Sequence, residues 1–168
     1  AVLLATTPAN AQRSAQAPEY VGQANAVVNG SSIPLERQNA QTDVKVRAFG
    51  FGGAKARNVV NGEKSPVRFR RGQGIAFIVR VPNQEIDPLS TIRLLPLKPR
   101  KGQRELEMIT GGIGGSRDRF NERAIALQAE RYGRNAFRVS TALPLEKGEY
   151  ALVAGSGYGL PLNLFAID

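Results

Sequence analysis

Turn-forming residues interrupt this sequence at short intervals, and the stretches between them alternate apolar with polar side chains. A period of two is that of a β-strand, whose successive side chains point to opposite faces of a sheet. The most β-prone stretch, 74–81, is apolar on most of both faces, which predicts a central strand. Roughly nine such segments, with turn signals every ~8–12 residues, predict an all-β fold: an antiparallel Ig-like β-sandwich with at most one short helix.

Several local patterns make the prediction more specific. Asn29-Gly30 and Lys101-Gly102 predict hairpin turns. The alternation of 42–49 predicts a half-buried strand with Val44, Val46 and Ala48 on one side. The glycine-rich segment 111–116 predicts a loop. Within 118–132 a strand over 124–128 is favoured, and one or two helical turns are the alternative, because the apolar residues there fit both periods.

The chain opens with an apolar run, Ala1 to Ala5, followed by Pro8 and by Ala9-Asn10-Ala11. This order resembles the end of a signal peptide cleaved before Gln12, and a mature N-terminal strand or tail is the alternative. Residues 1–18 are therefore predicted to be a signal-peptide remnant or a flexible leader, and 19–168 a single domain. The protein is expected to be exported, to the periplasm, the cell surface or the extracellular space.

Cysteine and histidine are both absent. The chain therefore lacks the residues that form disulfides and thiolate nucleophiles, together with the commonest general base and transition-metal ligand. Ser-His-Asp triads, papain-like pairs and zinc-activated waters are excluded. No cofactor or metal is predicted.

Positive charge is the main functional signal. Lys and Arg outnumber Asp and Glu by 23 to 14, a formal charge of +9, which predicts attraction to an anionic cell-surface polymer or an acidic protein. Aromatic residues do not alternate with the basic ones, which argues against binding of single-stranded nucleic acid. The candidate anion-binding residues are Lys45, Arg47, Lys64, Arg68, Arg70, Arg71, Arg117, Arg119 and Arg123. The alternative is a solvated sheet face whose charges prevent edge-to-edge pairing.

Other candidate sites carry weaker signals. Tyr158, in a glycine-rich turn, is a candidate ligand-contacting aromatic residue. Glu105 and Glu107 share a strand face, as hydrolase carboxylates could, but no Trp is available to line a sugar cleft. These two are expected to be solvated charges that counter Arg104 and its neighbours. The glycines of 111–115 are not followed by the Gly-Lys-Ser/Thr of a phosphate-binding loop.

The segment Leu145-Glu146-Lys147-Gly148-Glu149-Tyr150 resembles the L-x-x-G-x-Y pattern of the tyrosine corner in Ig-like and fibronectin-like domains. The resemblance implies that Tyr150 is buried with its hydroxyl bonded to upstream backbone, that Leu145 packs under the turn, and that Gly148 permits the turn.

More broadly, the chain from Tyr20 onward resembles uncharacterised exported bacterial proteins. The resemblance rests on Leu35-Glu36-Arg37, Lys64-Ser65-Pro66-Val67 and a final Phe-x-x-Asp, Phe165 to Asp168. It implies export and a sandwich fold, and no activity.

These patterns together predict a non-enzymatic exported binding module with a basic face. The alternative is a structural subunit of a surface appendage or envelope assembly, and a hydrolase that depends on carboxylates comes third.

Overall fold

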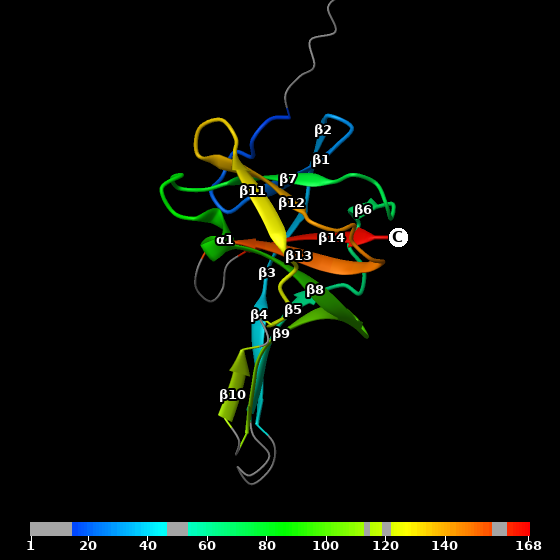
Figure 1. Ribbon diagram of the computed structural model, residues 1–168. Coiled ribbons are helices and arrows are strands. Elements are labelled where there is room, and N and C mark those ends of the chain that lie inside the picture. The colour runs from blue at the N-terminus through cyan, green and yellow to red at the C-terminus, as the bar shows by residue number, and fades with distance from the viewer. Residues whose placement is uncertain (1–14, 47–53, 113–114, 119–121, 156–160) are drawn as a thin grey trace, which may run out of the picture.

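The computed structural model describes residues 15–46, 54–112, 115–118, 122–155 and 161–168 (Figure 1). These residues include fourteen strands and one short helix, which confirms the all-β prediction. The elements are β1 (Ala24–Val28), β2 (Ser31–Pro34), β3 (Glu36–Asn39), β4 (Gln41–Val46), β5 (Ala54–Asn61), β6 (Arg68–Phe69), β7 (Ala76–Arg80), α1 (Pro88–Thr91), β8 (Ile92–Arg100), β9 (Gln103–Gly112), β10 (Gly115–Asp118), β11 (Leu127–Arg131), β12 (Ala136–Thr141), β13 (Gly148–Ala154) and β14 (Pro161–Ile167). The strands outnumber the nine expected because several are only two to four residues long, too short to show a period. No helix in this described part is long and apolar enough to cross a membrane.

The first sheet has five antiparallel strands in the order β11-β12-β7-β1-β2. Its middle strand, β7, is buried on both faces, as predicted: Phe77 and Val79 are fully buried on one side and Ile78 on the other. Asn29 and Gly30 join β1 to β2 with φ angles of 50° and 77°. Two positive φ angles are those of a type I′ turn, so the predicted hairpin is confirmed.

The second sheet has nine strands and curls into a half-barrel. Its main order is β3-β14-β13-β8-β9-β5-β4, with β10 beside β9 and β6 parallel to β14. β3 and β4 lie at opposite ends of this order, yet Ala40 alone separates them along the chain. The sheet must therefore bend back on itself. The Gln38 side chain joins the approaching strands, because it donates to the Asn61 carbonyl at 3.0 Å and accepts from the Asn61 N–H at 2.9 Å.

Two apolar cores follow from this arrangement. The larger one lies between the sheets and centres on Phe165, whose ring centroid is 5.0 Å from that of Phe77, 5.5 Å from that of Tyr150 and 6.0 Å from that of Phe69. The smaller one fills the inside of the curl, on the opposite face of β8, β13 and β14. Its buried members are Val60, Leu95, Leu97, Leu106, Ala151, Val153, Leu162 and Leu164.

One end of the curled sheet projects from the body (Figure 1). We call this projection the arm: β4, β10, and the residues 54–59 of β5 and 109–112 of β9 that pair with them. Two predictions fail here. The segment predicted as a loop at 111–116 enters strands, since Gly112 pairs with Gly115 in a β9–β10 hairpin. Val44 is 58% exposed rather than buried, because β4 lies at the edge of the arm, away from both cores.

The strand predicted at 124–128 lies further along the chain. β11 spans Leu127–Arg131 and pairs with β12 in the first sheet. Ile125 instead forms an isolated bridge to Leu94 of the second sheet, and its N–H donates to the Leu94 carbonyl at 2.8 Å. Ile125 and Leu127 therefore both pair as β residues, as their alternation predicts. They pair with different sheets, because the chain crosses from one sheet to the other between them.

The last residues of the predicted leader are held against the domain. Tyr132 donates its hydroxyl to the Ala15 carbonyl at 2.5 Å, and Arg80 donates to the Pro18 carbonyl at 2.9 Å. Pro18 is buried. Residues 15–18 therefore belong to the folded domain, although their composition carries no apolar period.

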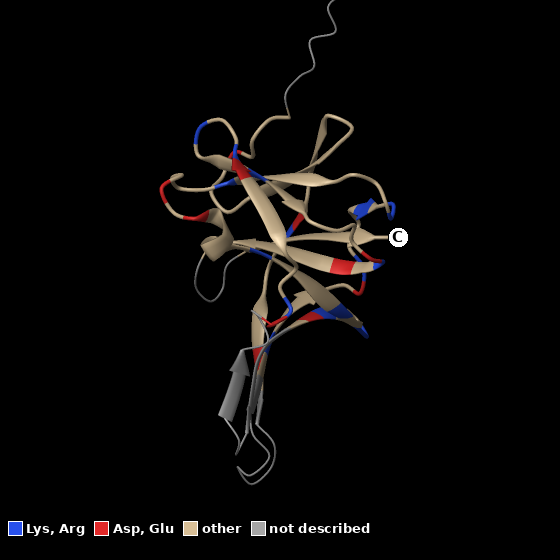
Figure 2. Ribbon diagram, viewed as in Figure 1, with Lys and Arg blue, Asp and Glu red and all other residues tan. Residues whose placement is uncertain are grey.

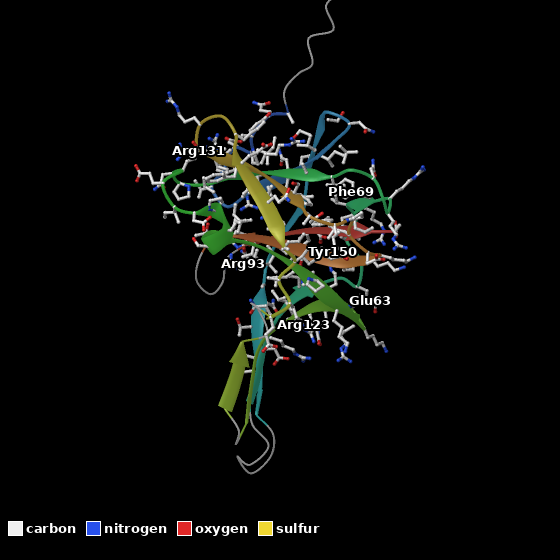
Figure 3. The ribbon with its side chains drawn as sticks, viewed as in Figure 1. Glu63, Phe69, Arg93, Arg123, Arg131 and Tyr150 are labelled. Atoms are coloured by element: carbon white, nitrogen blue, oxygen red, sulfur yellow. The ribbon has the colours of Figure 1, made fainter. Side chains whose placement is uncertain are left out.

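Tyr150 forms the contacts of a tyrosine corner. Its side chain is 5% exposed, and its hydroxyl donates to the Glu146 carbonyl four residues upstream at 2.7 Å (Figure 3). Leu145 packs against the main core, as predicted. The role expected for Gly148 is wrong: its φ is not in the positive range, and an added Cβ would meet the Tyr150 ring at an ordinary 3.6 Å.

Replacing Tyr150 by phenylalanine is expected to lower the free energy of unfolding by about 1–3 kcal/mol, because a carbonyl loses its donor at a largely buried ring. Tyr20→Phe is the matched control, since Tyr20 is 60% exposed and should change stability by no more than about 0.5 kcal/mol. Urea denaturation of the three proteins measures both effects. Equal stability of Tyr150→Phe and the wild type would show that the corner does not stabilise the fold.

Candidate anion-binding surfaces

The predicted basic residues fall into two separate groups. Lys45 and Arg117 lie in strands of the arm, and Arg123 is exposed where the arm joins the body (Figure 3). Residues 64–71 lie around β6, beside the C-terminus and away from the arm (Figure 1). A single continuous stripe of all nine residues is therefore not formed. Arg47, Arg119 and the candidate aromatic Tyr158 lie outside the described residues.

Within the arm, strand register brings basic residues into one cross-strand row. Lys45 of β4 is the Cα partner of Lys55 of β5, which is the partner of Thr110 of β9. Thr110 is in turn the partner of Arg117 of β10. We call Lys45, Lys55, Thr110 and Arg117 the basic row. Three of its four members are cationic and none is acidic, and like charges opposite each other in a sheet destabilise it.

The arm nearer the body has the opposite pattern. Arg57 pairs with Asp43 at 2.5 Å and with Glu105 at 2.6 Å. Glu105 also accepts from Arg100 at 3.3 Å and is 8% exposed, so the expectation of a solvated charge is wrong. The hydrogen bond with Asp43 helps to raise the pKa of Arg57 above its ordinary value. Charge is therefore balanced around Arg57, on the side of the basic row nearer the body.

The 64–71 segment offers fewer free cations than predicted. β6 contains only Arg68 and Phe69, so Lys64, Arg68 and Arg70 do not share a strand face. Arg68 pairs with Glu149 at 2.9 Å and with Asp168, and Arg71 pairs with Glu146 at 2.7 Å. Figure 2 shows acidic residues close to this basic segment. Lys64 and Arg70 are exposed.

A second set of charges is buried inside the body. The Arg104 side chain is fully buried and all five of its N–H groups have acceptors. Two donate to the Glu36 carboxylate, at 2.9 and 3.0 Å, and one to Glu149 at 3.4 Å. The other two donate to backbone carbonyls of Asn61 and Gly62.

Glu149 also accepts a hydrogen bond from Arg68, and Arg68 donates another to Asp168. We call Glu36, Arg104, Glu149, Arg68 and Asp168 the ion network. It joins β3, β9, β13, β6 and the residue that follows β14. Glu149 also accepts from the Ser65 N–H at 2.8 Å. The segments around Glu36, Ser65 and Asp168 thus meet in one place.

Two carboxylates of the ion network, Glu36 and Asp168, have pKa values below their ordinary values. Burial raises the pKa of Glu36, but hydrogen bonds from Arg104, Ser65 and Gln38 outweigh burial and leave this pKa below its ordinary value. The hydrogen bond from Arg68 lowers the pKa of Asp168. A general acid needs a raised pKa. The chemistry of this network therefore fits structural ion pairing.

Two residues of these sites, Lys55 and Arg104, are not among the candidate anion-binding residues that the sequence predicts. Lys55 was missed because residues 54–56 were not recognised as strand; a hairpin from 41 to 61 would have placed it opposite Lys45. Arg104 is predicted only as a charge that Glu105 and Glu107 counter, although its strand parity with the buried Leu106 points to burial.

Among the described residues, no group of three or more Asp, Glu, His or Cys side chains could hold a metal ion. Comparison with known proteins found no family model, no curated protein and no solved structure that matches this chain.

Proposed function

We propose that the protein is a non-enzymatic, exported binding module of the periplasm or cell surface that binds an anionic polymer or an acidic protein through the arm. The observation that carries the proposal is the basic row, where three cations stand in register without an acidic residue. Cations in register on neighbouring strands repel one another, and a bound polyanion would relieve this repulsion. The net charge of +9 and the signal-like residues 1–11 support the same proposal.

Heparin-affinity chromatography over a salt gradient tests the proposal. The arm variant combines Lys45→Gln, Lys55→Gln and Arg117→Gln. At about 1 kcal/mol per cation near an anionic surface, the variant should bind on the order of 100-fold more weakly and elute at lower salt.

The control variant combines Lys98→Gln, Lys101→Gln and Arg134→Gln, three exposed cations outside the arm. It loses the same charge and should elute close to the wild type. Equal shifts for both variants would mean that only net charge matters, and a wild type that flows through at low salt would refute the proposal.

A structural role in an envelope assembly is the second candidate. β4 and β10 each pair with one strand, so among the described residues both sides of the arm have an open edge. Such an edge can accept a strand from a neighbouring molecule. Sedimentation of the wild type and of a form without residues 1–14 tests this role. A monomer at all concentrations in both forms would exclude self-assembly.

The Ig-like character of the fold also remains a proposal. Two facing sheets and the tyrosine corner support it. The curl of the nine-stranded sheet and the parallel strand β6 are features that a simple sandwich of two antiparallel sheets does not have.

A further inference from the structure

A pocket of about 270 Å³ opens at the end of the molecule that carries α1 (Figure 1). It lies where the space between the two sheets meets solvent. Val81 after β7, Phe137 of β12 and Ala154 of β13 form its apolar base and are each less than 9% exposed. The pocket does not involve the arm or the ion network.

The rim of this pocket is apolar and open to solvent. Val21 is 57% exposed and Ile86 is 51% exposed, and both line the opening. Large apolar side chains gathered around a concave site in this way mark a surface that binds an apolar group.

Arg80 adds a positive charge to the lining. It is half-buried, and its guanidinium donates to two backbone carbonyls, of Pro18 at 2.9 Å and of Arg134 at 3.2 Å. No carboxylate of the described residues forms an ion pair with it. Arg57, Arg68 and Arg104 each have one or more carboxylate partners. Arg80 is therefore a partly desolvated cation beside an apolar pocket, with no counter-ion among the residues that the structure describes.

We propose that this pocket binds a small amphipathic anion. Its alkyl or aryl body would occupy the space above Val81, Phe137 and Ala154, and its carboxylate or sulfonate would pair with Arg80. The volume accommodates on the order of ten non-hydrogen atoms, at about 30 Å³ for each water-sized group.

Octanoate and its uncharged analogue octanol test the proposal, with amide chemical shifts of the isotope-labelled protein as the readout. Octanoate should bind saturably at one site, perturb the amides of Val81 and Ala154 most, and bind at least tenfold more tightly than octanol. Equal affinities, shifts centred elsewhere, or no saturable binding would overturn the proposal.

Two variants separate the charge from the apolar surface. Arg80→Gln should weaken octanoate binding at least tenfold and leave octanol binding unchanged. Arg138→Gln, an equal charge loss at an exposed position of β12, should affect neither ligand. Ile86→Glu, at an exposed rim position that folding tolerates, should weaken both. If Arg80→Gln binds octanoate like the wild type, the assignment of the anion to Arg80 is wrong.

Discussion

Replacing Arg104 by methionine is expected to lower the free energy of unfolding by about 3–5 kcal/mol, the cost of leaving buried charges without their partner. Methionine keeps much of the apolar stem, so the loss reports on the guanidinium. Removal of the guanidinium breaks the two contacts between Arg104 and the Glu36 carboxylate. It also leaves Glu149 with one arginine partner, Arg68, instead of two. Urea denaturation followed by circular dichroism measures the change.

Arg100→Met is the matched control for this prediction. Arg100 lies on the other strand of the same β8–β9 hairpin, opposite Gln103, and its side chain is 51% exposed with one contact to Glu105 at 3.3 Å. Such a pair contributes no more than about 1 kcal/mol. If Arg104→Met is as stable as Arg100→Met, the ion network does not hold the curled sheet together.

The effect of Arg104→Met should also depend on pH. The folded-state pKa of Glu36 lies below its ordinary value of 4.5. Its contribution to stability is therefore complete above about pH 4.5 and is lost as the pH falls through the folded-state pKa. The difference between wild type and variant should be full at pH 7 and should shrink in acid.

Replacing Phe165 by alanine is expected to cost about 3–5 kcal/mol of unfolding free energy. Phe165 is fully buried at the centre of the main core, and its ring contacts three aromatic rings from β6, β7 and β13. Its loss opens a cavity between the two sheets that rigid strands cannot close.

Leu143→Ala serves as the control for the core, because Leu143 is 77% exposed and should change stability by no more than about 0.5 kcal/mol. Phe165→Leu, which retains part of the volume, should lie between the two. A Phe165→Ala protein that unfolds at the same urea concentration as Leu143→Ala would show that the two sheets do not depend on this core.

Strands with a clear local period were predictable, because side-chain alternation is a property of the strand alone. The central strand around Phe77 and the hairpin at Asn29-Gly30 follow from such local signals. The curl of the second sheet was not predictable, since it depends on pairing between β3 and β14, far apart in sequence. The glycines of 111–116 predict a loop because glycine has a low intrinsic preference for strands. In the structure, pairing between β9 and β10 outweighs that preference.

The candidate sites divide in the same way. The tyrosine corner is a local motif, and Tyr150 and Leu145 were placed correctly. The basic row depends on the register of four strands, so Lys55 could not be matched with Lys45 and Arg117 from composition. The sequence also predicts free cations at Arg68 and Arg71. Both are paired in the structure, because their carboxylate partners come from strands and turns that are remote in sequence.

Titration of the isotope-labelled protein with a heparin hexasaccharide at low salt tests the central claim most directly, because it locates bound anion residue by residue. The account predicts that amide shifts concentrate in the arm, at residues 41–46, 54–59, 109–112 and 115–118, and that they vanish in the arm variant. Shifts concentrated at 64–71 instead, or spread evenly over exposed cations, would contradict it.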